Sequence, residues 1–262
     1  MDQHAFDALF IGAGIAGATA AAHLAASRRV AILAAEESPG YHATDRSAAV
    51  WIRNYGSPDA RLLTAASRAF FAAPPPGFAA AALMRPRPVV HLAPPVQVAT
   101  LGAMIGEGEG IREIDLEAVR AKVPALRPGH AAQAWYLRPK ARRKLMVSPA
   151  DETDSEACDA QPEEYDIALA LDRMRQALDI PVTRVEHRWA GRRSFTPDRR
   201  LAIGAGAEKG FFWMVGQGGC GIRTAPAAGR LLAAPVAGED PGERAPAAAL
   251  CDPRRFARGL AA

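Results

Sequence analysis

The chain has 262 residues, of which 49% are hydrophobic and 23% are charged, with a formal net charge of +4. This composition is that of a globular protein with a substantial core, and it excludes a wholly disordered chain. The basic residues are mostly scattered arginines without interleaved aromatic residues, so a nucleic-acid-binding protein is not expected.

The cysteines Cys158, Cys220 and Cys251 are far apart and lack the spacing of metal ligands. They predict reduced thiols in a cytoplasmic protein without a metal site. The apolar stretch at residues 8–22 follows acidic residues and contains several glycines. It is too short to cross a bilayer, so the sequence predicts neither a targeting segment nor a membrane span.

Residues 7–36 predict a strand, a glycine-rich turn, a helix and a second strand. The apolar run Ala8–Ile11 favours a parallel strand that is buried on both faces. The turn GAGIAG follows, then a helix from about Ile15 to Ser27 and a strand from Val30 to Leu33. This order is typical of a dinucleotide-binding unit, and a glycine turn with only a structural role is the alternative.

The glycines of this turn have distinct expected roles. Gly12 permits the tight bend, Gly14 lets the backbone approach a pyrophosphate, and Gly17 lets the helix lie close to the strand. The unpaired N–H groups and the dipole at the start of the helix favour an anion. The candidate cofactor-binding residues here are Gly12, Gly14, Ile15, Ala16 and Gly17.

Polar candidates follow the second strand. The acidic residue that binds ribose hydroxyls is expected about 20 residues beyond the glycines. Ala34 and Ala35 come directly after the strand, so Glu36 is the candidate. Arg46 and Ser47 are plausible phosphate ligands, and a surface loop with a helix cap explains them equally well.

The middle of the chain alternates predicted helices and short strands. Hydrophobic periodicity predicts helices at 58–72, 115–123 and 163–178, strands at 89–92, 145–147 and 182–189, and an extended segment at 135–139. The last third then repeats the order of the first unit, with a strand at 211–215, a glycine-rich turn and a helix from about Ile222 to Ala234.

The glycines of this second turn allow a flat or anionic ligand to approach the backbone closely. The alternative is a glycine-rich turn that binds no ligand. Its candidate residues are Gly216, Gln217, Gly218, Gly219, Gly221 and Ile222.

The motifs GAGIAG, GYHATDRSAA, LMVSPADET, WAGRRSFTPDRRLAIG and FFWMVGQGGCGIRTAPA occur in this order. Together they resemble the D-amino-acid oxidase and glycine oxidase family of FAD-dependent oxidoreductases. The resemblance implies an α/β fold: a Rossmann-like FAD-binding domain with a parallel sheet, formed by residues 1–55 and 190–262. It also implies a shortened α+β substrate domain inserted between them, at residues 56–189.

The resemblance further implies that the first glycine turn holds the FAD pyrophosphate and that Gly216–Ile222 faces the flavin ring. Arg193 matches the family arginine that holds the substrate carboxylate, for which a guanidinium fork is suited. The implied reaction is hydride transfer from an amino acid or amine to FAD, followed by hydrolysis of the imine and reoxidation of the flavin by oxygen. Homo-oligomerisation is a further expectation.

Several positions depart from the family pattern. Ala34 replaces a glutamate, Cys220 an aromatic residue and Arg223 an uncharged residue. The chain also passes almost directly from WYLRP to LMVSPADET at about Pro139, which implies that a central segment is missing and that apolar surface is exposed. A degenerate, non-catalytic flavoprotein is therefore the alternative, and an NAD-dependent dehydrogenase is a third interpretation of GAGIAG alone.

Overall fold

The computed structural model describes residues 5–91, 98–127, 136–139 and 144–259, with the backbone alone at 136–139 and 258–259. The chain divides into two compact units. The first unit combines Met1–Pro86 with Gly191–Ala262, and the second unit is Arg87–Ala190. The helix at 58–72 belongs to the first unit, although the predicted substrate domain at 56–189 includes it. The assignment of an FAD domain and a substrate domain stays a prediction.

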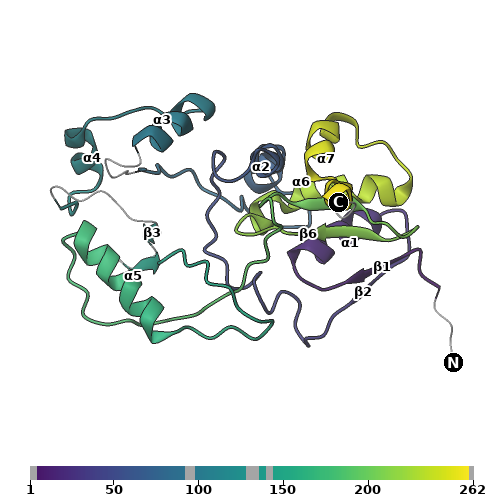
Figure 1. Cartoon of the computed structure of the whole chain (residues 1–262), viewed down its shortest axis with the longest axis horizontal. Helices are drawn as coiled ribbons and strands as arrows, with labels where there is room; N and C mark the ends of the chain where they lie inside the picture. Colours follow the sequence, from purple (N-terminus) through teal and green to yellow (C-terminus); the bar gives the residue numbers. More distant parts are fainter. Residues whose placement is uncertain (1–4, 92–97, 128–135, 140–143, 260–262) are drawn as a thin grey trace. The chain divides into compact units, whose positions relative to one another are not determined.

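The first unit begins with a strand, a helix and a strand, as predicted (Figure 1). The strands β1 (Ala8–Ile11) and β2 (Val30–Leu33) pair in parallel, with Ala8 opposite Val30 and Ile11 opposite Leu33. The helix α1 (Ile15–Leu24) connects them and ends earlier than predicted. Its buried residues are Ala20, Ala21 and Leu24, so small side chains allow close packing.

The prediction that β1 is buried on both faces is wrong. Phe10 faces the core and lies under Gly17 of α1, but Leu9 is 60% exposed and Ile11 is 80% exposed. On β2, Leu33 opposite Ile11 is 59% exposed. Within the described residues the parallel sheet has two strands, so α1 covers one face and no third layer covers the other.

The rest of the first unit packs around α6 (Gly221–Ala237). The helix α2 (Pro58–Ala72) contacts α6, and β5 (Ala202–Ala205) pairs antiparallel with β6 (Phe212–Val215). The helix α7 (Ala245–Cys251) lies between two short 3-10 helices, η2 (Gly242–Arg244) and η3 (Pro253–Gly259). The shared core includes residues of α2, β5, α6 and α7, together with Leu201: Ala60, Leu63, Leu201, Ile203, Ala228, Leu231 and Ala247. Phe212 and Met214 of β6 pack against it.

The second unit contains three helices and one hairpin among its described residues. The helices are α3 (Val98–Glu107), α4 (Leu116–Lys122) and α5 (Glu164–Ala177). The strands β3 (Tyr136–Pro139) and β4 (Leu145–Ser148) pair antiparallel. The core of this unit is formed by Val119, Leu126, Met174, Ala177 and Leu178. The sequence predicted α4, α5, β4 and the extended β3, but not α3.

Two strand predictions in this unit are wrong. Residues 89–91 and 182–189 have no regular secondary structure, and Leu92 lies outside the described residues. Val90 and Val182 nevertheless pack against the core of the second unit. The apolar pattern of these segments therefore reflects burial of individual side chains and not pairing with another strand.

The observed fold is α/β, with one parallel and two antiparallel strand pairs in the part of the chain that is described. None of the helices placed by the structure combines the length and apolar character needed to cross a membrane.

Candidate functional site

Close packing of α1 against α6 creates the candidate site. Thr19 Oγ1 donates a hydrogen bond to the carbonyl of Ala225 at 3.1 Å, and His23 Nε2 lies 3.1 Å from the carbonyl oxygen of Pro226. A Cβ placed on Gly221 would lie 3.4 Å from Cγ2 of Ile15. Since Ile15 and Gly221 are the first residues of the two helices, their N-termini lie side by side (Figure 1).

The first glycine turn has the tight geometry that its sequence predicts. Gly12 has a φ of +104°, and its N–H donates to the carbonyl of Leu33 at 2.8 Å. A Cβ on Gly17 would overlap the carbonyl oxygen of Gly12, so only glycine allows the helix to start this close to the strand. Gly14 is the N-cap of α1.

The segment after β2 folds back over this turn. The N–H of Gly40 donates to the carbonyl of Ala13 at 3.0 Å, and Ile15 N–H donates to Thr44 Oγ1 at 3.0 Å. Thr44 was not among the residues predicted to bind a ligand, and its hydroxyl satisfies one N–H of the first turn of α1. The N–H groups of Ala16 and Gly17 point toward the same end and have no intrahelical acceptor, as in any helix.

The structure places the three polar candidates in or beside this folded segment. Glu36 Oε1 lies 2.9 Å from Nε2 of His42, and both side chains are about half exposed. Ser47 Oγ accepts a hydrogen bond from Ala49 N–H at 3.0 Å. The side chain of Arg46 lies against Gly191, with its guanidinium over the ring of Tyr41.

The second glycine turn packs against the segment that carries Arg193. Gly216 and Gly218 have φ angles of +71° and +47°, and Gly218 N–H donates to the carbonyl of Ser194 at 2.9 Å. The ring of Phe195 covers Gly218, and Arg193 Nη1 lies 3.8 Å from the position of a Cβ on Gly219. The structure therefore brings Arg193 beside the turn formed by Gly216–Ile222.

Buried donors around the start of α6 lack acceptors. In the described part of the chain, Trp51 Nε1, Gln217 Nε2 and Arg223 Nε are buried without a hydrogen-bond partner. The residue after Trp51, Ile52, accepts a hydrogen bond from Arg223 Nη1, so Trp51 is adjacent to this region along the chain. Unsatisfied buried donors are costly, and all three would suit a ligand rich in carbonyl oxygens or negative charge. A flavin dinucleotide fits this requirement.

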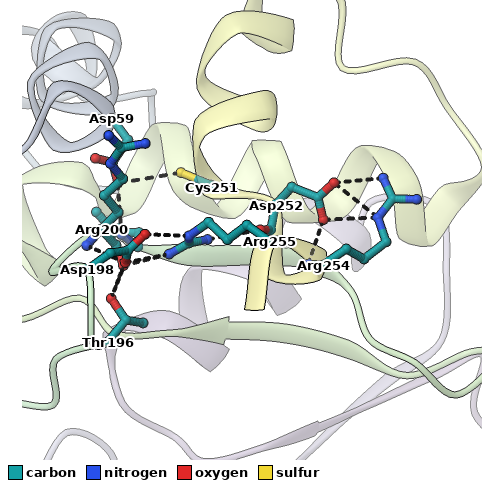
Figure 2. A network of polar contacts seen from close by, with 9 residues as sticks. Asp59, Thr196, Asp198, Arg200, Cys251, Asp252, Arg254 and Arg255 are labelled. Atoms are coloured by element: carbon teal, nitrogen blue, oxygen red, sulfur yellow. Dashed lines mark hydrogen bonds and ion pairs between the residues drawn. The ribbon is translucent and has the colours of Figure 1, made fainter. Parts of the chain in front are cut away.

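A polar network fixes the loop that follows Phe195. Figure 2 shows Arg255 donating to both carboxylate oxygens of Asp198, at 2.7 and 3.1 Å. Arg255 also donates to the carbonyl of Arg200, and Thr196 Oγ1 donates to the same oxygen. The hydrogen bonds from Arg255 lower the pKa of Asp198 well below its usual range. The loop next to Arg193 is thereby attached to η3.

A second branch of this network is buried. Asp59, in the first turn of α2, accepts a hydrogen bond from Leu201 N–H at 2.8 Å. Cys251 Sγ lies 3.7 Å from the same carboxylate oxygen (Figure 2). Burial, together with the nearby Asp59 charge, raises the pKa of Cys251 to about 12. Cys251 is therefore a structural thiol.

A parallel strand pair joined through a glycine turn and a helix is typical of the α/β proteins that bind dinucleotides. The sequence model of the family described as DAO, FAD dependent oxidoreductase, matches residues 7–137 and 127–234. The chain belongs to this family. The match in two pieces indicates a shortened member, as the junction near Pro139 implies.

The fold is also similar to that of a solved relative. The crystal structure of glycine oxidase from Bacillus cereus ATCC 14579 superposes with a TM-score of 0.63 and 15% sequence identity. The alignment covers 90% of this chain and 98% of that chain. At this identity, the similarity concerns the fold.

Proposed function

We propose that the chain binds FAD and oxidises a small amino acid or amine, with oxygen as the electron acceptor. The family uses FAD. The observation that best supports the proposal is the packing of α1 against α6, which places two glycine-rich helix N-termini side by side. One N-terminus would suit a pyrophosphate and the other the electron-rich side of a flavin ring, so a cofactor longer than one nucleotide is the natural ligand.

Particular residues would hold the cofactor. Gly12, Gly14 and Gly17 leave the backbone open to the pyrophosphate, with the N–H groups of Ile15 and Ala16 at the start of the helix. Glu36 is proposed for the ribose, although it must first release His42. Arg46 and Ser47 would lie along the phosphates. Backbone and side-chain donors of Gly216–Ile222, including Gln217 Nε2, would face the flavin ring.

Arg193 would bind and orient the substrate carboxylate. Its guanidinium lies beside Gly219, within the turn proposed to face the ring. A two-pronged ion pair would fix the carboxylate and leave the α C–H directed at the cofactor. FAD, when bound, supplies the chemistry of accepting the hydride and passing the electrons to oxygen.

The test is the visible spectrum of the protein purified and mixed with FAD. Flavin absorption near one equivalent per chain, bleached by glycine or a D-amino acid without oxygen, is the expected result, with peroxide formed when air returns. Failure to retain FAD would overturn cofactor binding. Bleaching by no amino acid or amine would support the second candidate described below.

Replacement of Arg193 tests its role. R193A should weaken substrate binding strongly while FAD stays bound, because the guanidinium contacts the substrate and not the cofactor. R192A is the matched control, since it removes a charge from the adjacent residue. Loss of FAD in R193A, or an equal effect of R192A on substrate binding, would refute the assignment.

The second candidate is a non-catalytic flavoprotein of the same family. It is favoured by the family match in two pieces and by the two-stranded parallel sheet, which leaves Leu9 and Ile11 exposed. This candidate folds with or without FAD and turns over no substrate. Where FAD binds, the bleaching experiment separates the two candidates, and a folded chain that retains no FAD would favour the second. Membership of an FAD-dependent family leaves the third interpretation, an NAD-dependent dehydrogenase, without support.

A further inference from the structure

Arg223 is a buried cation at the start of α6. It is only 5% exposed and lies in the first turn of the helix. Its guanidinium donates to the carbonyls of Ile52 and Tyr55 and lies 2.7 Å from the thiol sulfur of Cys220. The Tyr55 ring stacks on it, with 5.1 Å between Cζ and the ring centroid.

All of these partners are neutral dipoles or weak acceptors. In the described residues, no carboxylate lies within ion-pair distance of Arg223, and Nε has no acceptor. A buried charge that no counter-ion neutralises produces a field that water screens poorly. Since the charge lies at the N-terminus of α6, its field adds to that of the helix dipole. Together they favour a negative charge at this end of the helix.

The backbone around Gly56 packs against this guanidinium and holds it in place. Gly56 has a φ of +95°, and a Cβ on it would lie 3.0 Å from Arg223 Nη2 and 3.3 Å from Cys220 Sγ. The backbone of the 52–56 segment therefore packs directly on the Arg223–Cys220 pair.

We propose that Arg223 acts as an electrostatic positioning residue for the cofactor. Its charge increases the affinity of the site for negative charge on the N1 and C2 carbonyl side of a flavin ring. This inference rests on the proposed binding of FAD. It predicts a flavin that is reduced more readily than in a variant without the charge.

Sulfite is the probe, because it adds through its sulfur lone pair to N5 of oxidised flavin and places negative charge on the N1 and C2 carbonyl side without a leaving group. The dissociation constant of sulfite from the FAD-loaded protein should rise by about tenfold or more in R223Q, as expected for loss of one poorly screened charge. The midpoint potential of the flavin should fall. R223K retains the charge and should keep most of the sulfite affinity.

R230Q is the matched control, since it removes an exposed charge from the same helix and should leave sulfite affinity unchanged. FAD-loaded R223Q with wild-type sulfite affinity would overturn the inference and leave the proposed function intact. If R223Q does not retain FAD, R223K decides: wild-type affinity supports the role of charge, and an affinity reduced about tenfold refutes it. A wild-type protein that binds no FAD overturns both proposals.

Discussion

Gly229 of α6 lies directly against Thr19 of α1. A Cβ on Gly229 would stand 2.8 Å from Thr19 Oγ1 and 2.9 Å from the carbonyl carbon of Thr19. Because one of these atoms belongs to the backbone, rotation of the Thr19 side chain cannot relieve the contact. This pair sets how closely α1 and α6 approach, and therefore how close the two glycine turns are.

G229A should destabilise the first unit. Overpacking costs about 1–3 kcal/mol, and the helix propensity of alanine returns only about 1 kcal/mol of it. G102A in α3 is the matched control, because a Cβ there meets no atom within 4 Å and the same substitution should be neutral or stabilising. Chemical denaturation followed by circular dichroism measures both. Equal stability of G229A and wild type would contradict the close contact.

Thr44 should contribute to stability as a cap of α1. T44V removes the acceptor of Ile15 N–H while keeping the shape of the side chain, so it should cost about 1 kcal/mol. T44S retains the hydroxyl and should lose much less. The free energy of unfolding from denaturant titration distinguishes the two variants. If T44S lost as much stability as T44V, packing of the Thr44 methyl group and not the hydrogen bond would explain the effect.

The sequence predicted the elements whose signals are local. The limits of β2 and α2 agree with the prediction, because apolar periodicity and flanking residues define them. At the start of α2, for example, these flanking residues are Ser57 and Pro58. Both glycine turns were predicted from their own residues. The contact between them could not be, because it depends on Gly221 meeting Ile15 across more than two hundred positions of sequence.

Partners from distant segments account for the missed features. Thr44 and Phe195 lie within the quoted motifs, but nothing in those motifs shows what each side chain contacts. The contacts of Thr44, Phe195 and Trp51 depend on which segment folds over each turn. The wrong strand predictions at 89–91 and 182–189 have the same cause. Apolar side chains such as Val90 and Val182 predict burial, but only a neighbouring strand with free backbone groups turns such a segment into a strand.

Exposure of Ile11 is a consequence of the uncovered sheet face. I11T should change the free energy of unfolding by less than about 0.5 kcal/mol, because Ile11 is 80% exposed and threonine keeps the β-branch. The same substitution at Ile203, which is 3% exposed, should cost about 2–4 kcal/mol by removing core contacts and burying a hydroxyl. Thermal and urea unfolding measure both. A large loss in I11T would show that another layer covers this face in solution.

The cysteines should differ in reactivity. Cys158 is exposed, whereas Cys251 is fully buried and its pKa is raised to about 12. Alkylation by iodoacetamide at pH 8, followed by peptide mass spectrometry, should modify Cys158 in the native protein and Cys251 only after denaturation, since the thiolate is the reactive form. Native alkylation of Cys251 at the rate of Cys158 would mean that α7 does not stay packed over Asp59.

The Asp198–Arg255 pair should make stability depend on pH. Because the hydrogen bonds from Arg255 lower the pKa of Asp198 in the folded protein, ionised Asp198 stabilises the fold at neutral pH. The unfolded carboxyl has a pKa of about 3.9. This contribution is therefore present in full above about pH 4 to 5, and it is lost as the pH falls below that value toward the folded pKa.

D198N should cost about 1 kcal/mol at pH 7, a modest value because solvent screens a partly exposed pair. The difference between wild type and D198N should stay constant from pH 7 to about pH 5 and shrink at pH 4 and pH 3, because the carboxyl of Asp198 takes up a proton in the unfolded wild type while it stays ionised in the folded protein. D179N is the matched control, since Asp179, which pairs with Arg127, is far more exposed than Asp198. A wild-type advantage that did not shrink between pH 5 and 3 would show that the Asp198 side chain stabilises the loop through its shape and hydrogen bonds, and not through its charge.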